Sequence, residues 1–126
     1  MVNNAGVAVE GSAVTGVGGI ARLHNIPAAI FDQTMSINTR GVFLGCKYAI
    51  TQMLNQEPLP ANGRGDQTRG WIVNMASILG NVALTGAPSY TVSKHAVMGI
   101  TKQVAVDYAK DRIHCNSICP GCKSLV

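Results

Sequence analysis

The sequence predicts an α/β fold in which parallel strands alternate with helices. Short apolar runs that end in small or polar residues occur at 1–6, 71–77 and 111–121, and such runs are typical of buried strands. Two long segments, 26–54 and 88–110, carry apolar residues near the helical period. Strands that alternate with helices in this way pair in parallel through helical crossovers. We therefore expect about three strands and two long helices.

The composition limits the possible functions before any motif is considered. Of the 126 residues, 47% are apolar and 13% are charged, which suits one small domain with a buried core. The net charge of +4 comes from basic residues that are scattered singly, so we expect no nucleic-acid partner. No apolar stretch reaches the roughly 20 residues that cross a bilayer, so no membrane partner is expected either. Four cysteines without a signal peptide indicate reduced thiols and a cytoplasmic protein.

The elements follow one another in a clear order. "MVNNAG" predicts a strand that turns at Gly6, and a Gly-rich loop follows over 7–26. In the first helix Gly41 and Gly45 interrupt the apolar pattern, which indicates that something packs closely against them. A loop rich in Pro and Gly over 55–70 leads to the second strand. The helical side chains expected in the core are Ile30, Phe31, Ile37, Val42, Leu44, Tyr48, Leu54, Val92, Ala96, Val97, Ile100, Val104 and Tyr108.

Tyr90 and Lys94 lie four residues apart at the start of the second helix, so they share one helix face. A nearby ammonium favours the phenolate and would make the phenol a usable general acid or base. Ser77 ends the preceding strand, and parallel sheets present their sites at the carboxyl ends of strands. The three side chains are therefore expected to converge there. The alternative is an ordinary surface pair in which the lysine extends along the aromatic ring.

Five motifs occur in one order along the chain: "NNAG" (3–6), "INTRGVF" (37–43), "IVNMAS" (72–77), "YTVSK" (90–94) and "NSICPG" (116–121). Together they resemble the short-chain dehydrogenase/reductase family over nearly the whole chain. The resemblance implies a partial Rossmann-like, doubly wound parallel sheet, with residues 1–126 forming the catalytic half of an NAD(P)-binding domain. It implies an oxidoreductase that interconverts a small-molecule secondary alcohol and a ketone by hydride transfer with NAD or NADP. It also implies a homo-oligomer in the full-length form.

The resemblance assigns roles to single residues. Tyr90 would be the general acid/base, and Lys94 would stabilise its phenolate and bind the nicotinamide ribose. Ser77 would position the substrate oxygen, and Asn38 would hold a water that links Lys94 to solvent. The alternatives are a strand-end cap for Ser77 and a local helix irregularity for Asn38. The residues expected to line or border the cofactor are Asn4, Ala5, Gly6, Tyr90, Lys94, Pro120 and Gly121.

Other polar residues are given structural rather than chemical roles. We expect Asn3 and Asn116 to tie neighbouring strands together. "TGVGGIA" (15–21) fits a dinucleotide-binding pattern, but no clear strand leads into it, so we interpret it as a flexible loop. Four possible metal ligands lie within nine residues of one another. This crowding disfavours a tetrahedral site, and no metal is expected there. This group is His114, Cys115, Cys119 and Cys122.

The chain differs from the family pattern at both ends. In the family a Gly-rich turn that cradles the cofactor pyrophosphate precedes the NNAG strand, and here Met1 stands almost directly on that strand. Leu125 stands where a threonine would be expected. We therefore expect the isolated chain to be unstable or inactive and its full-length parent to be an oxidoreductase. The alternative is an inactive remnant that binds intact relatives through its two long helices.

Overall fold

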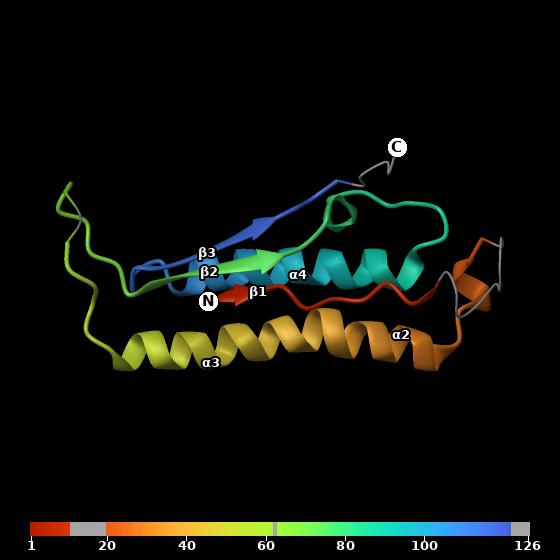
Figure 1. The fold of residues 1–126 in the computed structure, drawn as a ribbon, viewed down its shortest axis with the longest axis horizontal. Coiled ribbons are helices and arrows are strands. Elements are labelled where there is room, and N and C mark those ends of the chain that lie inside the picture. The colour runs from red at the N-terminus through yellow and green to blue at the C-terminus, as the bar shows by residue number, and fades with distance from the viewer. Residues whose placement is uncertain (11–19, 62, 122–126) are drawn as a thin grey trace.

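The computed structural model describes residues 1–10, 20–61 and 63–121. Its three strands form one parallel sheet in the order β1–β2–β3. The strands are β1 (Val2–Asn3), β2 (Gly70–Met75) and β3 (Ile113–Ile118). The predicted α/β fold with parallel strands is confirmed. All three strands point in the same direction, so their carboxyl ends meet at one edge of the sheet (Figure 1).

Helices fill the connections between the strands. The first connection holds α2 (Ala28–Met35), a π-helical turn (Ser36–Arg40) and α3 (Gly41–Asn55), which follow one another without a break. The second holds α4 (Pro88–Asp107), which ends earlier than the predicted Lys110. Short 3-10 turns occur at Leu23–Asn25 and Ile78–Gly80. No helix within the described residues has the length and apolar character needed to cross a membrane.

Both long helices, α3 and α4, pack against the same face of the sheet (Figure 1). Ile72 and Ile113 point into this layer and are 1% exposed. Trp71 and His114 lie on the opposite face, where their rings stack with centroids 6.3 Å apart, and Trp71 is 53% exposed. No helix or strand of the described chain covers that second face. Parallel sheets are normally covered on both faces, so the described residues supply one side of a two-sided architecture.

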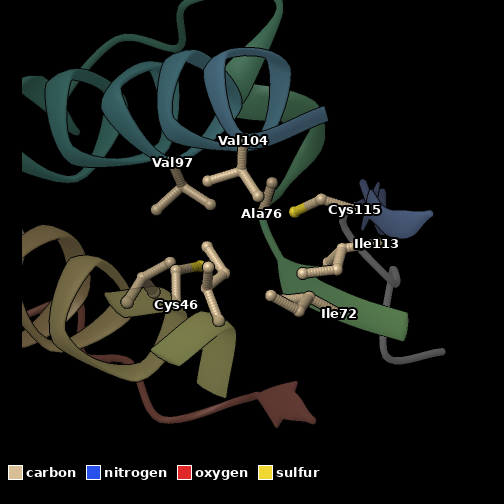
Figure 2. Close-up of a cluster of buried hydrophobic side chains, with 9 residues drawn as sticks. Cys46, Ile72, Ala76, Val97, Val104, Ile113 and Cys115 are labelled. Atoms are coloured by element: carbon tan, nitrogen blue, oxygen red, sulfur yellow. The ribbon is translucent and has the colours of Figure 1, made fainter. Parts of the chain in front are cut away.

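The core lies between the sheet and the two helices (Figure 2). Val97 and Val104 reach it from α4, and Val42 reaches it from α3, as predicted. The prediction was wrong for Tyr48, Leu54 and Val92, which are 65%, 41% and 44% exposed. On the first helical segment the buried positions are spaced four apart, and two of them are polar: Thr34, Asn38, Val42, Cys46 and Ile50. A pattern drawn from apolar residues alone could not follow that face.

A buried amide ties the sheet to its helices. The Asn74 side chain is 0% exposed, accepts a hydrogen bond from Asn3 Nδ2 at 2.8 Å and donates one to Thr101 Oγ1 at 3.0 Å. Asn3 therefore links β1 to β2, as expected. Asn116 is exposed and makes no side-chain hydrogen bond with the rest of the described chain, which differs from the expectation. A Cβ at Gly45 would overlap the Asn3 amide, so the predicted close packing is confirmed at this glycine.

Candidate active site

Tyr90 and Lys94 are placed by the start of α4. Proline suits the first turn of a helix because its missing N–H would have no intrahelical partner there, and α4 begins at Pro88. Tyr90 lies in this first turn and Lys94 lies one turn further on. The Lys94 ammonium lies 5.4 Å from the centroid of the Tyr90 ring. The expected common face is confirmed.

Lys94 is not a surface residue. Its side chain is 4% exposed, and its Nζ donates a hydrogen bond to the carbonyl oxygen of Met75 at 2.8 Å. Because Met75 is the last residue of β2, this bond fixes the ammonium at the carboxyl end of the central strand. Burial lowers the pKa of Lys94 from its ordinary value, since the charged form loses hydration. The alternative of an exposed surface pair is therefore wrong.

Asn38 holds the segment that follows the first strand. Its Oδ1 accepts from the backbone N–H of Val7 at 2.8 Å, and its Nδ2 donates to the carbonyl oxygen of Val7 at 2.8 Å. Nδ2 also donates to Ser93 Oγ on α4 at 3.0 Å. The residue is 0% exposed and lies in the π-helical turn, so the helix irregularity considered for this position is present. Both N–H donors of the amide are used within the protein.

We expect Asn38→Ala to destabilise the fold strongly, because it leaves both backbone groups of Val7 without their partner. A buried polar group that loses its hydrogen bond costs about 1–3 kcal/mol, and because the two Val7 groups are only partly buried, we expect a total of about 2–4 kcal/mol. Urea unfolding measures this free energy, and Asn55→Ala at the exposed end of α3 is the matched control. Equal stabilities of the two variants would contradict the role of Asn38 as a clamp.

A cavity of about 300 Å³ opens between Tyr90, Lys94 and the segment after β1. Its full lining is Asn4, Gly6, Val7, Ala8, Met75, Ala76, Tyr90 and Lys94. A Cβ at Gly6 would lie 3.3 Å from Asn38 Oδ1 and 3.4 Å from Lys94 Nζ. Glycine therefore keeps the wall of the cavity open directly beside the lysine.

The other predicted site residues lie around this cavity rather than in its wall. Ser77 is 8% exposed, and its Oγ accepts a hydrogen bond from the backbone N–H of Leu79 at 3.2 Å, so it does cap the turn that follows β2. Pro120 is brought beside this turn, because its carbonyl oxygen accepts from the N–H of Ile78 at 2.9 Å. Ala5 and Gly121 are exposed and do not line the cavity. The roles of these residues remain predictions.

Within residues 1–10, 20–61 and 63–121, no three His, Cys, Asp or Glu side chains gather in a way that could hold a metal ion. Cys122 and Leu125 lie outside the described residues, as does most of "TGVGGIA" (15–21).

Two residues of the site were missed by the sequence analysis. The carboxylate of Glu10 accepts a hydrogen bond from the backbone N–H of Tyr90 at 2.8 Å. Ser93, which lies inside the YTVSK motif, accepts from Asn38 and donates to the carbonyl oxygen of Tyr90 at 2.7 Å. The sequence offered one sign of Glu10: it is the first acidic residue of the chain and stands far from the next one, Asp32.

Comparison with known proteins decides the family. A family model described as short chain dehydrogenase matches residues 1–124. The chain belongs to the short-chain dehydrogenase family. Among curated short-chain dehydrogenase relatives, the 2-(R)-hydroxypropyl-CoM dehydrogenase of Xanthobacter autotrophicus is 44% identical over 121 residues, which cover 96% of this chain and 41% of that protein.

Solved structures of similar proteins carry the same fold. ElxO with NADP bound matches with a TM-score of 0.73 and 30% identity, over 95% of this chain and 40% of that one. The 4-hydroxyisoleucine dehydrogenase complexed with NADH matches with a TM-score of 0.71 and 26% identity, over 95% of this chain and 44% of that one. This short-chain dehydrogenase chain therefore spans about two-fifths of the length of the relatives that it matches.

Proposed function

We propose that residues 1–126 form the catalytic half of an NAD(P)-binding domain in an oxidoreductase that interconverts a secondary alcohol and a ketone by hydride transfer. The observation that carries this proposal is the cavity in which the Tyr90 ring and the Lys94 ammonium face a glycine-containing wall at the carboxyl end of β2. Ligands of open parallel sheets bind at this end of the strands. Relatives that are dehydrogenases, and similar structures with NADP or NADH bound, support the same reaction class.

The residues present fit one end of a nicotinamide cofactor. A volume of about 300 Å³ is at the low end for ligand pockets, which suits the nicotinamide ribose rather than a whole dinucleotide. The absent Cβ of Gly6 lets a ligand approach the backbone beside Lys94. A lysine ammonium has three N–H donors, and the Met75 carbonyl takes one of them. The others can serve ribose hydroxyls.

A bound nicotinamide supplies or accepts the hydride. Tyr90 donates the proton to the substrate oxygen during reduction and takes it back during oxidation, and the Lys94 ammonium stabilises its phenolate. The Ser77 oxygen accepts from Leu79, which leaves its hydrogen to donate to the substrate oxygen. Asn38 keeps Val7 at the cavity wall. Both N–H donors of the Asn38 amide are bound within the protein. A water that links Asn38 to Lys94 would therefore donate to the second acceptor position of Asn38 Oδ1.

The test measures NADH and NADPH oxidation with a panel of aliphatic and cyclic ketones, and the reverse reaction with the corresponding alcohols. The assay uses the full-length parent of this chain. We expect turnover with at least one ketone and one of the two cofactors. An absence of turnover with both cofactors across the panel, together with an absence of cofactor binding by fluorescence titration, would contradict the proposed reaction.

A second candidate function is an inactive remnant that binds intact relatives. It is favoured by the open second face of the sheet, which no helix or strand of the described chain covers. Titration of the purified 126-residue chain with NADH and NADPH, combined with a co-elution experiment, separates the two candidates. Saturable binding supports the enzyme, whereas no binding together with co-elution with an intact relative supports the remnant. A homo-oligomeric parent and a cytoplasmic location are parts of the first proposal.

A further inference from the structure

The first turn of α4 is capped by a residue from a distant part of the chain. Ala87 precedes the helix and offers no side-chain acceptor, and Pro88 has no N–H. The N–H groups of a first helical turn have no intrahelical partner and need one from elsewhere. For Tyr90 this partner is the carboxylate of Glu10, whose Oε1 accepts the backbone N–H at 2.8 Å across eighty residues of sequence.

Among the described residues, the hydrogen bond from the Tyr90 N–H is the polar contact that holds the buried Glu10 carboxylate. The residue is 2% exposed, although a carboxylate that loses its hydration is costly to bury. Its other oxygen, Oε2, is buried and has no hydrogen-bond partner among the described residues. Two interactions stabilise the buried carboxylate: the hydrogen bond from the Tyr90 N–H and the positive end of the α4 dipole. The buried carboxylate of Glu10 therefore serves to bind the backbone N–H of Tyr90.

The contact belongs to a clamp with two points. Asn38 holds Val7 by its backbone, and Glu10, three residues later, holds the start of α4. The residues between Asn4 and Ala8 include one wall of the cavity, and Tyr90 lies in its opposite part. Ser93 completes the connection, because it bonds to Asn38 and to the carbonyl oxygen of Tyr90. The segment from Val7 to Glu10 is thereby held at both ends, which fixes the cavity wall relative to Tyr90.

We propose that Glu10 is a positioning residue for Tyr90: its carboxylate locks the backbone of the tyrosine to the cavity wall and so sets where the phenol meets the substrate oxygen. The inference rests on the proposed function, since it concerns the same hydroxyl. A helix cap with a purely structural role would lower the unfolding temperature and leave the kinetics of the folded enzyme unchanged. A positioning role changes kcat and leaves the KM for the cofactor nearly unchanged.

The experiment uses the full-length parent and compares Glu10→Ala and Glu10→Gln with the wild type and with Glu57→Ala, an exposed acidic residue that does not line the cavity. Assays run well below the lowest unfolding midpoint of the set, so that all proteins are folded. Because misplacement by about 1 Å can cost about 100-fold in rate, we expect kcat of Glu10→Ala to fall about 10-fold to 100-fold. The cofactor KM should stay within about 3-fold, because this variant leaves the lysine and the glycine wall in place. Glu10→Gln should recover most of kcat, since its amide oxygen still accepts the Tyr90 N–H.

Two outcomes overturn the inference while the enzyme is active. One is a kcat of Glu10→Ala equal to that of Glu57→Ala, and the other is a Glu10→Gln variant as slow as Glu10→Ala. A wild type that turns over no substrate is a failure of the proposed function, and the catalytic role of Glu10 falls with it. Hydrogen exchange of the Tyr90 amide then still reports on the clamp itself. Faster exchange in Glu10→Ala than in Glu10→Gln shows that the contact exists, and equal exchange in all variants shows that it does not.

Discussion

Replacing Tyr90 with phenylalanine is expected to lower kcat about 1,000-fold and to leave the cofactor affinity nearly unchanged. The reason is that the substitution removes only the hydroxyl that moves the proton, and general acid–base catalysis contributes about 10²–10⁴-fold. The ring that lies 5.4 Å from the Lys94 ammonium remains in place, so the cavity keeps its shape. Steady-state kinetics of the full-length parent with its preferred cofactor give kcat, and fluorescence titration gives the affinity.

Tyr48→Phe is the matched control for this variant. Tyr48 loses the same hydroxyl, but its side chain is 65% exposed on α3, so kcat should stay at the wild-type value. A Tyr90→Phe protein that retains most of its turnover would exclude this tyrosine as the general acid/base. A loss of both turnover and cofactor binding would indicate that the hydroxyl supports the cofactor instead.

Asn74→Ala is expected to cause a large loss of stability. Asn74 joins β1 to α4 through its bonds to Asn3 and Thr101, and the thiols of Cys46 and Cys115 lie beside it at 3.6 and 3.5 Å. The substitution leaves the Asn3 amide buried without its partner and opens a void. Each buried group that loses its partner costs about 1–3 kcal/mol, so we expect a loss of about 3–5 kcal/mol in the free energy of unfolding.

Urea unfolding followed by circular dichroism measures this loss. Asn116→Ala on the neighbouring strand is the control, because Asn116 is exposed on the open face of the sheet. Surface substitutions of this kind usually change stability by less than about 0.5 kcal/mol. If Asn74→Ala unfolds at the same urea concentration as Asn116→Ala, the buried amide is not the link between the sheet and its helices.

The order of elements and the main pair of the site were predictable from local patterns. Apolar runs and helical periodicity each span only a few residues, so they located β2 and α4 well. The i to i+4 spacing alone placed Tyr90 and Lys94 on one helix face. The motifs then placed Gly6 in the cavity wall, because a glycine after a strand often permits close approach.

Other features depend on contacts between distant segments and were therefore missed. The exposure of Tyr48 and Val92 follows from how α3 and α4 turn toward the sheet, which an apolar pattern does not specify. The buried face of the first helical segment runs through polar Thr34 and Asn38, which such a pattern leaves out. Glu10 gave no local sign of its partner, since nothing near it in sequence identifies Tyr90 as the group that it caps.

Asn38 grips residue 7 entirely through the peptide groups of that residue. The hydrogen bonds to Asn38 therefore do not depend on which side chain stands at this position, although the same residue lines the cavity. Natural selection can consequently remodel the surface beside the reactive phenol by point changes at position 7, with no compensating change at position 38. Proline is the one residue barred there, because it lacks the N–H that the amide oxygen binds.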